Sequence, residues 1–263
     1  MTANSSPYTD HHVPRGPAVR GTVVVVPGRG ETRETYTRFG KRLAADAYRV
    51  RVVDPAPLGP KDPEPTLTRL GARIAGAVTG TAEADGDVVH PVVLIGADTG
   101  AVALAAMLGR AARTAEAGVR PDAVVLAGYP SRTAMPTAES WEQELDRRTS
   151  CPAHRAALTG DAAFGRGVLG LPVPDGLLAA LHDGRTDIPT LILTGDADPL
   201  ADHDALVRTA ASLPRARLSV VRGARHDVLN DLQHRSVAAE IVTFLEALRG
   251  GLVPLVTVES SAW

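Results

Sequence analysis

Asp98 is the residue whose sequence context most strongly suggests catalytic chemistry. It stands in Gly96-Ala97-Asp98-Thr99-Gly100, directly after an apolar run and directly before a helical pattern. Glycines on both sides of one reactive side chain are typical of a nucleophile elbow, because the turn is sharp and only small neighbours fit. An aspartate in front of a helix is also a common N-terminal cap, so the pentapeptide alone supports both interpretations.

Two later segments favour the elbow. The segment LTGDADP (193–199) places Asp196 and Asp198 after a late apolar run, and GARHD (223–227) places His226 before the last helical pattern. The chain order of nucleophile, acid and histidine is that of the α/β-hydrolase fold. From the residues alone, either Asp196 or Asp198 could be the acid.

A glycine-rich loop follows the first strong apolar run, in the segment VPGRGE (26–31). Such a loop can turn backbone N–H groups toward a developing oxyanion. A dinucleotide-binding loop is not indicated, because Arg33 stands where the third glycine of that motif belongs.

Short apolar runs alternate with helical patterns along most of the chain. The runs are uniformly apolar, which indicates strands buried on both faces, as in a parallel sheet. They cover residues 22–27, 49–54, 91–96, 122–128, 189–195 and 217–223. Helical patterns cover residues 33–46, 66–79, 100–113, 202–213 and 235–249. We therefore expect an α/β fold with a doubly wound, mostly parallel sheet whose carboxyl edge holds the ligand site.

The alternation breaks once, between residues 131 and 185. A long insertion after a strand, over the ligand edge, predicts a helical lid inserted in the core. The expected organisation is an N-terminal extension (1–20), an α/β-hydrolase core (21–130 and 186–249), the lid (131–185) and a C-terminal tail (250–263). The apolar tail is compatible with an edge strand, a packing arm or a contact in a homodimer.

The chain resembles the monoacylglycerol lipase and lysophospholipase branch of the α/β-hydrolase superfamily. The resemblance lies in PGRGE (27–31), GADTG (96–100), LTGDADPLAD (193–202) and GARHDVLND (223–231), which match that branch's HGxGE loop, GxSxG elbow, acid loop and histidine loop. It implies that Asp98, Asp198 and His226 are catalytic, and that the N–H groups of Arg29 and Thr99 form the oxyanion hole. The chain departs from the branch at Pro27, where histidine is usual, and at Asp98, where serine is usual. Gly28, Tyr129 and Trp141 are candidate pocket residues.

An aspartate nucleophile suits a different reaction from serine. Attack on an ester would give a mixed anhydride, whereas attack on a saturated carbon gives an ordinary alkyl ester that His226 and water can hydrolyse. Haloalkane dehalogenases and epoxide hydrolases of the superfamily work in this way, although the chain has Thr99 after the nucleophile and no tyrosine in the inserted segment. We therefore expect a hydrolase that acts on a small or medium, apolar organic molecule. Two alternatives stay open: a lyase, cyclase or isomerase of secondary metabolism that uses Asp98 and His226 for proton transfer, and a non-catalytic small-molecule binding protein.

Composition excludes several other classes. The chain has 263 residues, 44% of them hydrophobic, and a formal net charge of −2 without a block of like charge, so neither nucleic acid nor an anionic membrane is an expected partner. One cysteine, Cys151, excludes an intramolecular disulfide and fits a reducing compartment. With no apolar signal region near the N-terminus, a cytoplasmic location is expected. No organic cofactor is implied, and Cys151 with His154 supplies too few ligands for a metal site.

Overall fold

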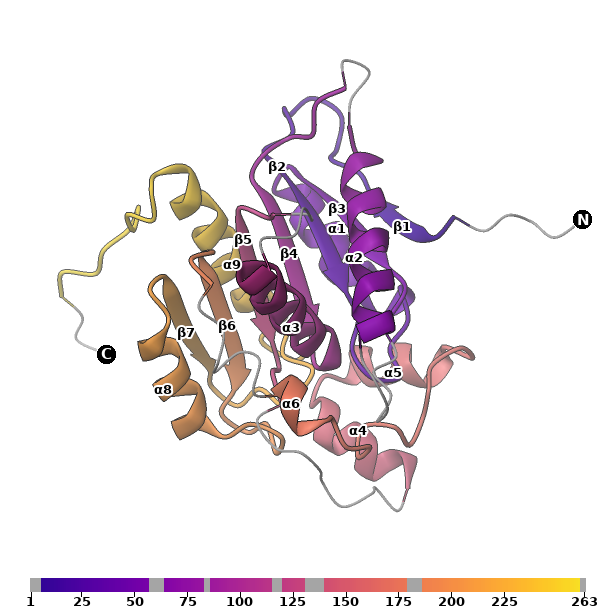
Figure 1. Ribbon diagram of the computed structural model, residues 1–263. Helices are drawn as coiled ribbons and strands as arrows, with labels where there is room; N and C mark the ends of the chain where they lie inside the picture. The colour runs from indigo at the N-terminus through magenta and orange to yellow at the C-terminus, as the bar shows by residue number, and fades with distance from the viewer. Residues whose placement is uncertain are drawn as a thin grey trace, which may run out of the picture.

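The computed structural model describes residues 6–56, 64–82, 86–114, 120–130, 140–178 and 186–260. These residues form a single sheet with helices on both faces, as Figure 1 shows. The fold is the expected α/β architecture with a mostly parallel sheet. Among the described residues, no helix has both the length and the apolar character needed to cross a membrane.

The sheet of the described residues has seven strands in the order β1-β3-β2-β4-β5-β6-β7. Their bounds are β1 (Tyr8–His11), β2 (Gly21–Val26), β3 (Tyr48–Val53), β4 (Val92–Ala97), β5 (Ala123–Ala127), β6 (Thr190–Gly195) and β7 (Ala216–Val221). β1 pairs antiparallel with β3, and every other pair is parallel. The six expected strands are present, with ends that differ by at most two residues.

Helices cover both faces of the sheet (Figure 1). Their bounds are η1 (Glu34–Tyr36), α1 (Thr37–Ala45), α2 (Glu64–Thr79), α3 (Thr99–Thr114), α4 (Trp141–Arg148), α5 (Pro152–Gly160), α6 (Asp175–Leu178), α8 (His203–Ser212) and α9 (His234–Arg249). Side chains of α2, α3 and α8 pack in one core cluster, and side chains of α1 and α9 pack in a second.

The alternation of side chains along a strand explains the two core clusters. In β2, Val24 and Val26 pack with α2 and α3, whereas Val23 and Val25 pack with α1 and α9, and all four are fully buried. Both faces of a central strand are therefore apolar, which is why its sequence shows a continuous apolar run.

Two segments lie outside the six strands and five helices that the sequence pattern predicts. Residues 8–11, in the expected N-terminal extension, form the edge strand β1. Their sequence YTDH contains no apolar run, so the sequence pattern does not predict this strand. Between β5 and β6, the described residues 140–178 carry α4, α5 and α6, which lie beyond the carboxyl ends of the strands in Figure 1. Residues 131–139 and 179–185 of the expected lid lie outside the described residues, and the lid itself stays a prediction.

Candidate active site

Asp98 lies at the turn between β4 and α3, in a backbone conformation that non-glycine residues rarely adopt. Its φ is +46°, and its carbonyl accepts the Ala101 and Val102 N–H groups of the first helical turn. The neighbouring glycines are required by close approach. A Cβ on Gly96 would lie 2.6 Å from the Ala101 backbone, and one on Gly100 would lie 2.3 Å from the Val26 carbonyl oxygen. The turn thus presents the Asp98 side chain at the carboxyl edge of the sheet.

The structure brings Asp98, His226 and Asp198 together. The His226 Nε2 lies 3.2 Å from Asp98 Oδ1, close enough for an ion pair although the two groups are out of alignment for a hydrogen bond. On the other side of the ring, His226 Nδ1 lies 2.9 Å from Asp198 Oδ2. All three residues are at most 5% exposed. Asp196, the other candidate acid, instead accepts the Gly223 N–H at 2.6 Å.

The two carboxylates control the protonation of His226. Burial by itself would lower the histidine pKa, but the negative charges of Asp198 and Asp98 outweigh it and raise this pKa to about 10. Burial would likewise raise the pKa of Asp98, yet Arg29 and His226 hold it well below its usual range. At neutral pH the site therefore contains an imidazolium between two carboxylates.

Arg29 contacts Asp98 through both its backbone and its side chain. Its N–H donates to Asp98 Oδ2 at 2.8 Å, and Nε donates to the same oxygen at 2.8 Å. Nη2 donates to Oδ1 at 2.7 Å, which completes a bidentate ion pair. The described residues show no hydrogen bond from the Thr99 N–H to the Asp98 carboxylate. Only one of the two expected oxyanion donors therefore touches this carboxylate.

A network of buried charges lies behind the site and joins the inserted helices to the histidine loop. Arg148 of α4 is 1% exposed. Its Nη2 donates to Glu144 Oε1 and to the Arg29 carbonyl, each at 2.9 Å. Its Nη1 lies 3.6 Å from Asp227 Oδ1. Asp227 also pairs with His154 of α5 at 2.9 Å. The Asp227 N–H donates to the Arg148 carbonyl at 2.8 Å. These residues fix the position of the loop that carries His226.

Glu31, from the same glycine-rich loop as Arg29, is a member of this network. It accepts the Gly28 N–H at 2.6 Å and the Tyr36 hydroxyl. Burial, together with the nearby negative charge of Asp227, raises its pKa to about 7. The sequence indicates the loop, but no local pattern in it marks the support that Glu31 and Arg148 give to the loop.

The three candidate pocket residues lie in different surroundings. Gly28 lies against the site, where an added Cβ would be 2.7 Å from the Asp98 Cβ. Tyr129 is fully buried and donates its hydroxyl to the Leu178 carbonyl of α6 at 2.9 Å. Trp141 packs on Phe164 at 5.6 Å between ring centroids and donates to Thr159 within the inserted segment. A pocket role for these residues stays a prediction.

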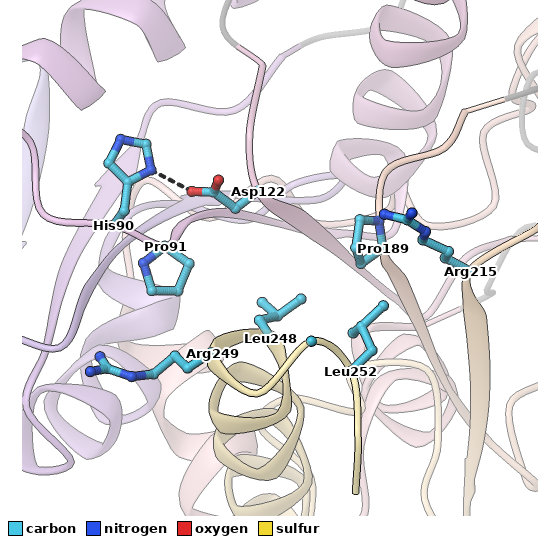
Figure 2. A pocket seen from close by; sticks show the side chains of 9 residues that line it. His90, Pro91, Asp122, Pro189, Arg215, Leu248, Arg249 and Leu252 are labelled. Carbon is cyan, nitrogen blue, oxygen red and sulfur yellow. Dashed lines mark hydrogen bonds and ion pairs between the residues drawn. The ribbon is translucent and has the colours of Figure 1, made fainter.

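Among the described residues, little free space is left beside Asp98. The cavity that Asp98, His226 and Glu31 help to line has a volume of about 10 Å³. A much larger cavity of about 740 Å³ lies at the opposite, amino edge of the sheet, between His90, Asp122, Arg215 and Arg249 (Figure 2). Over the described residues, no group of three or more His, Cys, Asp or Glu side chains is placed to hold a metal ion.

Solved structures with the same fold include lipases and a lactonase. The chain is similar to the monoacylglycerol lipase of Paleococcus ferrophilus, with 17% identity, a TM-score of 0.68, and coverage of 92% of this chain and 98% of that one. A soluble variant of monoglyceride lipase from Saccharomyces cerevisiae is similar as well, with 17% identity and a TM-score of 0.69. The match covers 92% of this chain and 91% of that one. The enol-lactonase from Burkholderia xenovorans LB400 has 17% identity with this chain and a TM-score of 0.60. The match covers 91% of this chain and 95% of that one. These similarities establish the fold.

No curated protein matches the sequence. The family model described as "Serine aminopeptidase, S33" matches residues 17–233, a span that includes the elbow, the acid loop and the histidine loop. The chain therefore belongs to the serine aminopeptidase S33 family and is a hydrolase of the α/β-hydrolase superfamily.

Proposed function

We propose that this hydrolase uses Asp98 as a nucleophile on a saturated carbon that carries a leaving group. The observation that carries the proposal is the position of His226 between Asp98 and Asp198, with Asp98 Oδ2 held by the Arg29 N–H at 2.8 Å. One carboxylate oxygen is thereby bound to a backbone donor, and the other faces the histidine.

In the first step, Asp98 Oδ1 attacks the substrate carbon. A carbon–Oδ1 bond forms, the bond to the leaving group breaks, and the leaving group departs with the electron pair. The product of this step is an alkyl ester on Asp98. In the second step, water attacks the Asp98 Cγ while His226 accepts its proton, and the Arg29 N–H stabilises the negative charge that develops on Oδ2. Collapse releases the alcohol, which takes the proton from His226, and regenerates Asp98.

The charges of the site fit this order of steps. In the resting enzyme His226 is protonated at neutral pH, because its pKa is raised to about 10 by two carboxylates. Formation of the ester removes the negative charge of Asp98, one of the two charges that raise this pKa. The histidine pKa then falls, His226 releases its proton to solvent, and the neutral imidazole can act as the base of the second step. His226 takes up a proton from solvent again when the Asp98 carboxylate is regenerated.

Proton transfer by Asp98 itself is less well supported. A carboxylate whose pKa is well below its usual range accepts a proton poorly near neutrality. The lyase or cyclase alternative is therefore not favoured. A pure binding protein would in turn have no use for the buried pair of His226 and Asp198, whose burial is costly.

The proposal is tested by mass spectrometry in ¹⁸O-labelled water with a panel of bromoalkanes, bromoalkanoates and terminal epoxides. Over many turnovers, label should enter the Asp98 carboxylate, because water attacks Cγ. The His226→Gln variant should instead accumulate the alkyl adduct on Asp98, and Asp98→Asn should show neither label nor adduct. Turnover without label at Asp98, or an enzyme that converts no member of the panel and forms no adduct, counts against the proposal.

A further inference from the structure

Arg29 is the residue that covers Asp98 in this structure. Its guanidinium occupies both carboxylate oxygens of Asp98, at 2.8 Å through Nε and 2.7 Å through Nη2. Oδ1, the oxygen that faces His226, cannot approach a substrate carbon while Nη2 is bound to it. Among the described residues, the cavity beside Asp98 has a volume of only about 10 Å³ in this arrangement. The side chain of Arg29 must therefore move before the site can act.

The backbone of Arg29 is held by the inserted segment, and its side chain is 11% exposed. The Arg29 carbonyl accepts Arg148 Nη2 at 2.9 Å, and the next carbonyl, that of Gly30, accepts the Gly165 N–H at 2.8 Å. The third guanidinium nitrogen, Nη1, donates to the carbonyl of Leu171, a residue that is 54% exposed. A rotation that breaks the hydrogen bonds of the guanidinium would open the site without moving the N–H that holds Oδ2.

The group that can replace Asp98 on this guanidinium is another carboxylate. Arginine binds planar carboxylates through two parallel N–H donors, and Asp98 occupies these two donors in the resting site. In the resting site the counter-ion of the guanidinium is the buried Asp98. A neutral substrate that displaced Asp98 would leave the guanidinium without a counter-ion, which costs free energy. A substrate carboxylate avoids that cost because one ion pair replaces the other.

We infer that the substrate carries a carboxylate, which takes the Arg29 guanidinium from Asp98 and thereby frees Oδ1 for attack. This inference rests on the proposed function, since it assigns Asp98 the role of nucleophile. Arg29 then acts both as the cover of the resting site and as the residue that selects anionic substrates. A neutral compound of the same length lacks the group that opens the site.

The inference is tested by binding, independently of turnover. The probe is sodium hexanoate, with hexanamide as the neutral control, and affinity is measured by isothermal titration calorimetry. In the wild type, Asp98 competes with hexanoate for Arg29. The Asp98→Asn variant lacks that competitor and should bind hexanoate at least tenfold more tightly. Asp98→Ser serves as a second neutral variant if the asparagine protein does not fold.

The part played by the guanidinium is isolated in the Asp98→Asn background. Adding Arg29→Lys keeps the positive charge but removes the paired donors, and should reverse the gain in hexanoate affinity by at least tenfold. Hexanamide affinity should change by much less than hexanoate affinity in each variant, because the amide forms no ion pair with the guanidinium. An Asp98→Asn protein that binds hexanoate no more tightly than wild type, or a gain that persists with Arg29→Lys, overturns the inference. Neither result depends on whether Asp98 is alkylated, so the proposed function can fail or stand separately.

Discussion

The two edges of the sheet differ in what they bury. At the carboxyl edge, Asp98, His226, Asp198 and Arg148 are each at most 5% exposed, and the cavity beside Asp98 measures only about 10 Å³. At the amino edge, a cavity of about 740 Å³ lies open (Figure 2), and the side chains of its His90–Asp122 pair are 66% and 43% exposed. Of these two cavities, volume alone would favour the one at the amino edge. Buried charges that depend on one another are costly, however, and they concentrate where a protein does chemistry.

The largest expected effect comes from Asp98→Ser at the carboxyl edge. Serine supplies the hydroxyl usual at this position in the branch that the chain resembles, and it removes one of the carboxylates that raise the His226 pKa. We expect a fluorophosphonate probe to label residue 98 in this variant and not in the wild type, with hydrolysis of p-nitrophenyl acetate as a second readout. The native activity should fall by about 10³-fold or more. A folded variant that neither labels nor hydrolyses would show that His226 or the Arg29 N–H is unsuited to support a nucleophile there. Its control, Asp98→Ser with His226→Gln, should not label.

A pair of arginine substitutions compares the stability of the two edges. Arg148→Met should lower the free energy of unfolding by about 3–5 kcal/mol, because it removes the guanidinium that pairs with the buried carboxylates of Glu144 and Asp227. Arg215→Met, at the exposed rim of the amino-edge cavity, should change it by less than about 0.5 kcal/mol. Urea unfolding at pH 7 measures both values. If both substitutions changed the free energy of unfolding equally, the buried charges of the carboxyl edge would matter no more for stability than the exposed charges of the amino edge.

The smallest expected effect is a dependence of stability on pH that originates at His226. Its folded pKa of about 10 lies above the usual 6.5, so its contribution is complete below about pH 6.5 and is lost as the pH rises toward 10. Between pH 7.5 and 9.5, this residue should lower the free energy of unfolding by about 1.4 kcal/mol per pH unit. Urea unfolding of wild type and His226→Gln across that range isolates the contribution of His226 to the pH dependence of stability. Only the wild type should show this contribution. Asp198→Asn should show a smaller slope, because it removes one of the raising charges. Parallel curves for all three proteins would mean that His226 is not held as an imidazolium.

The central sheet could be predicted from the sequence with ends accurate to at most two residues, because strands buried on both faces appear as continuous apolar runs. β1 could not be predicted in this way. It is an edge strand that pairs only with β3, and its sequence YTDH contains no apolar run. The same contrast holds in the site. The elbow and the histidine loop are marked by local glycines and by chain order, whereas Arg148 and Glu144 read as an ordinary exposed i, i+4 pair on an amphipathic helix.

By itself the sequence determined the α/β architecture, the order of Asp98, Asp198 and His226, and the backbone loop that contains Arg29. These properties follow from local patterns: apolar runs, flanking glycines and the order of segments along the chain. Tertiary structure alone decided which aspartate meets His226, that the Arg29 side chain covers Asp98, and that Arg148 is buried among carboxylates. The physical reason is that each of these depends on segments far apart in the chain, and the ionisation of a buried group is set by the charges that folding brings beside it.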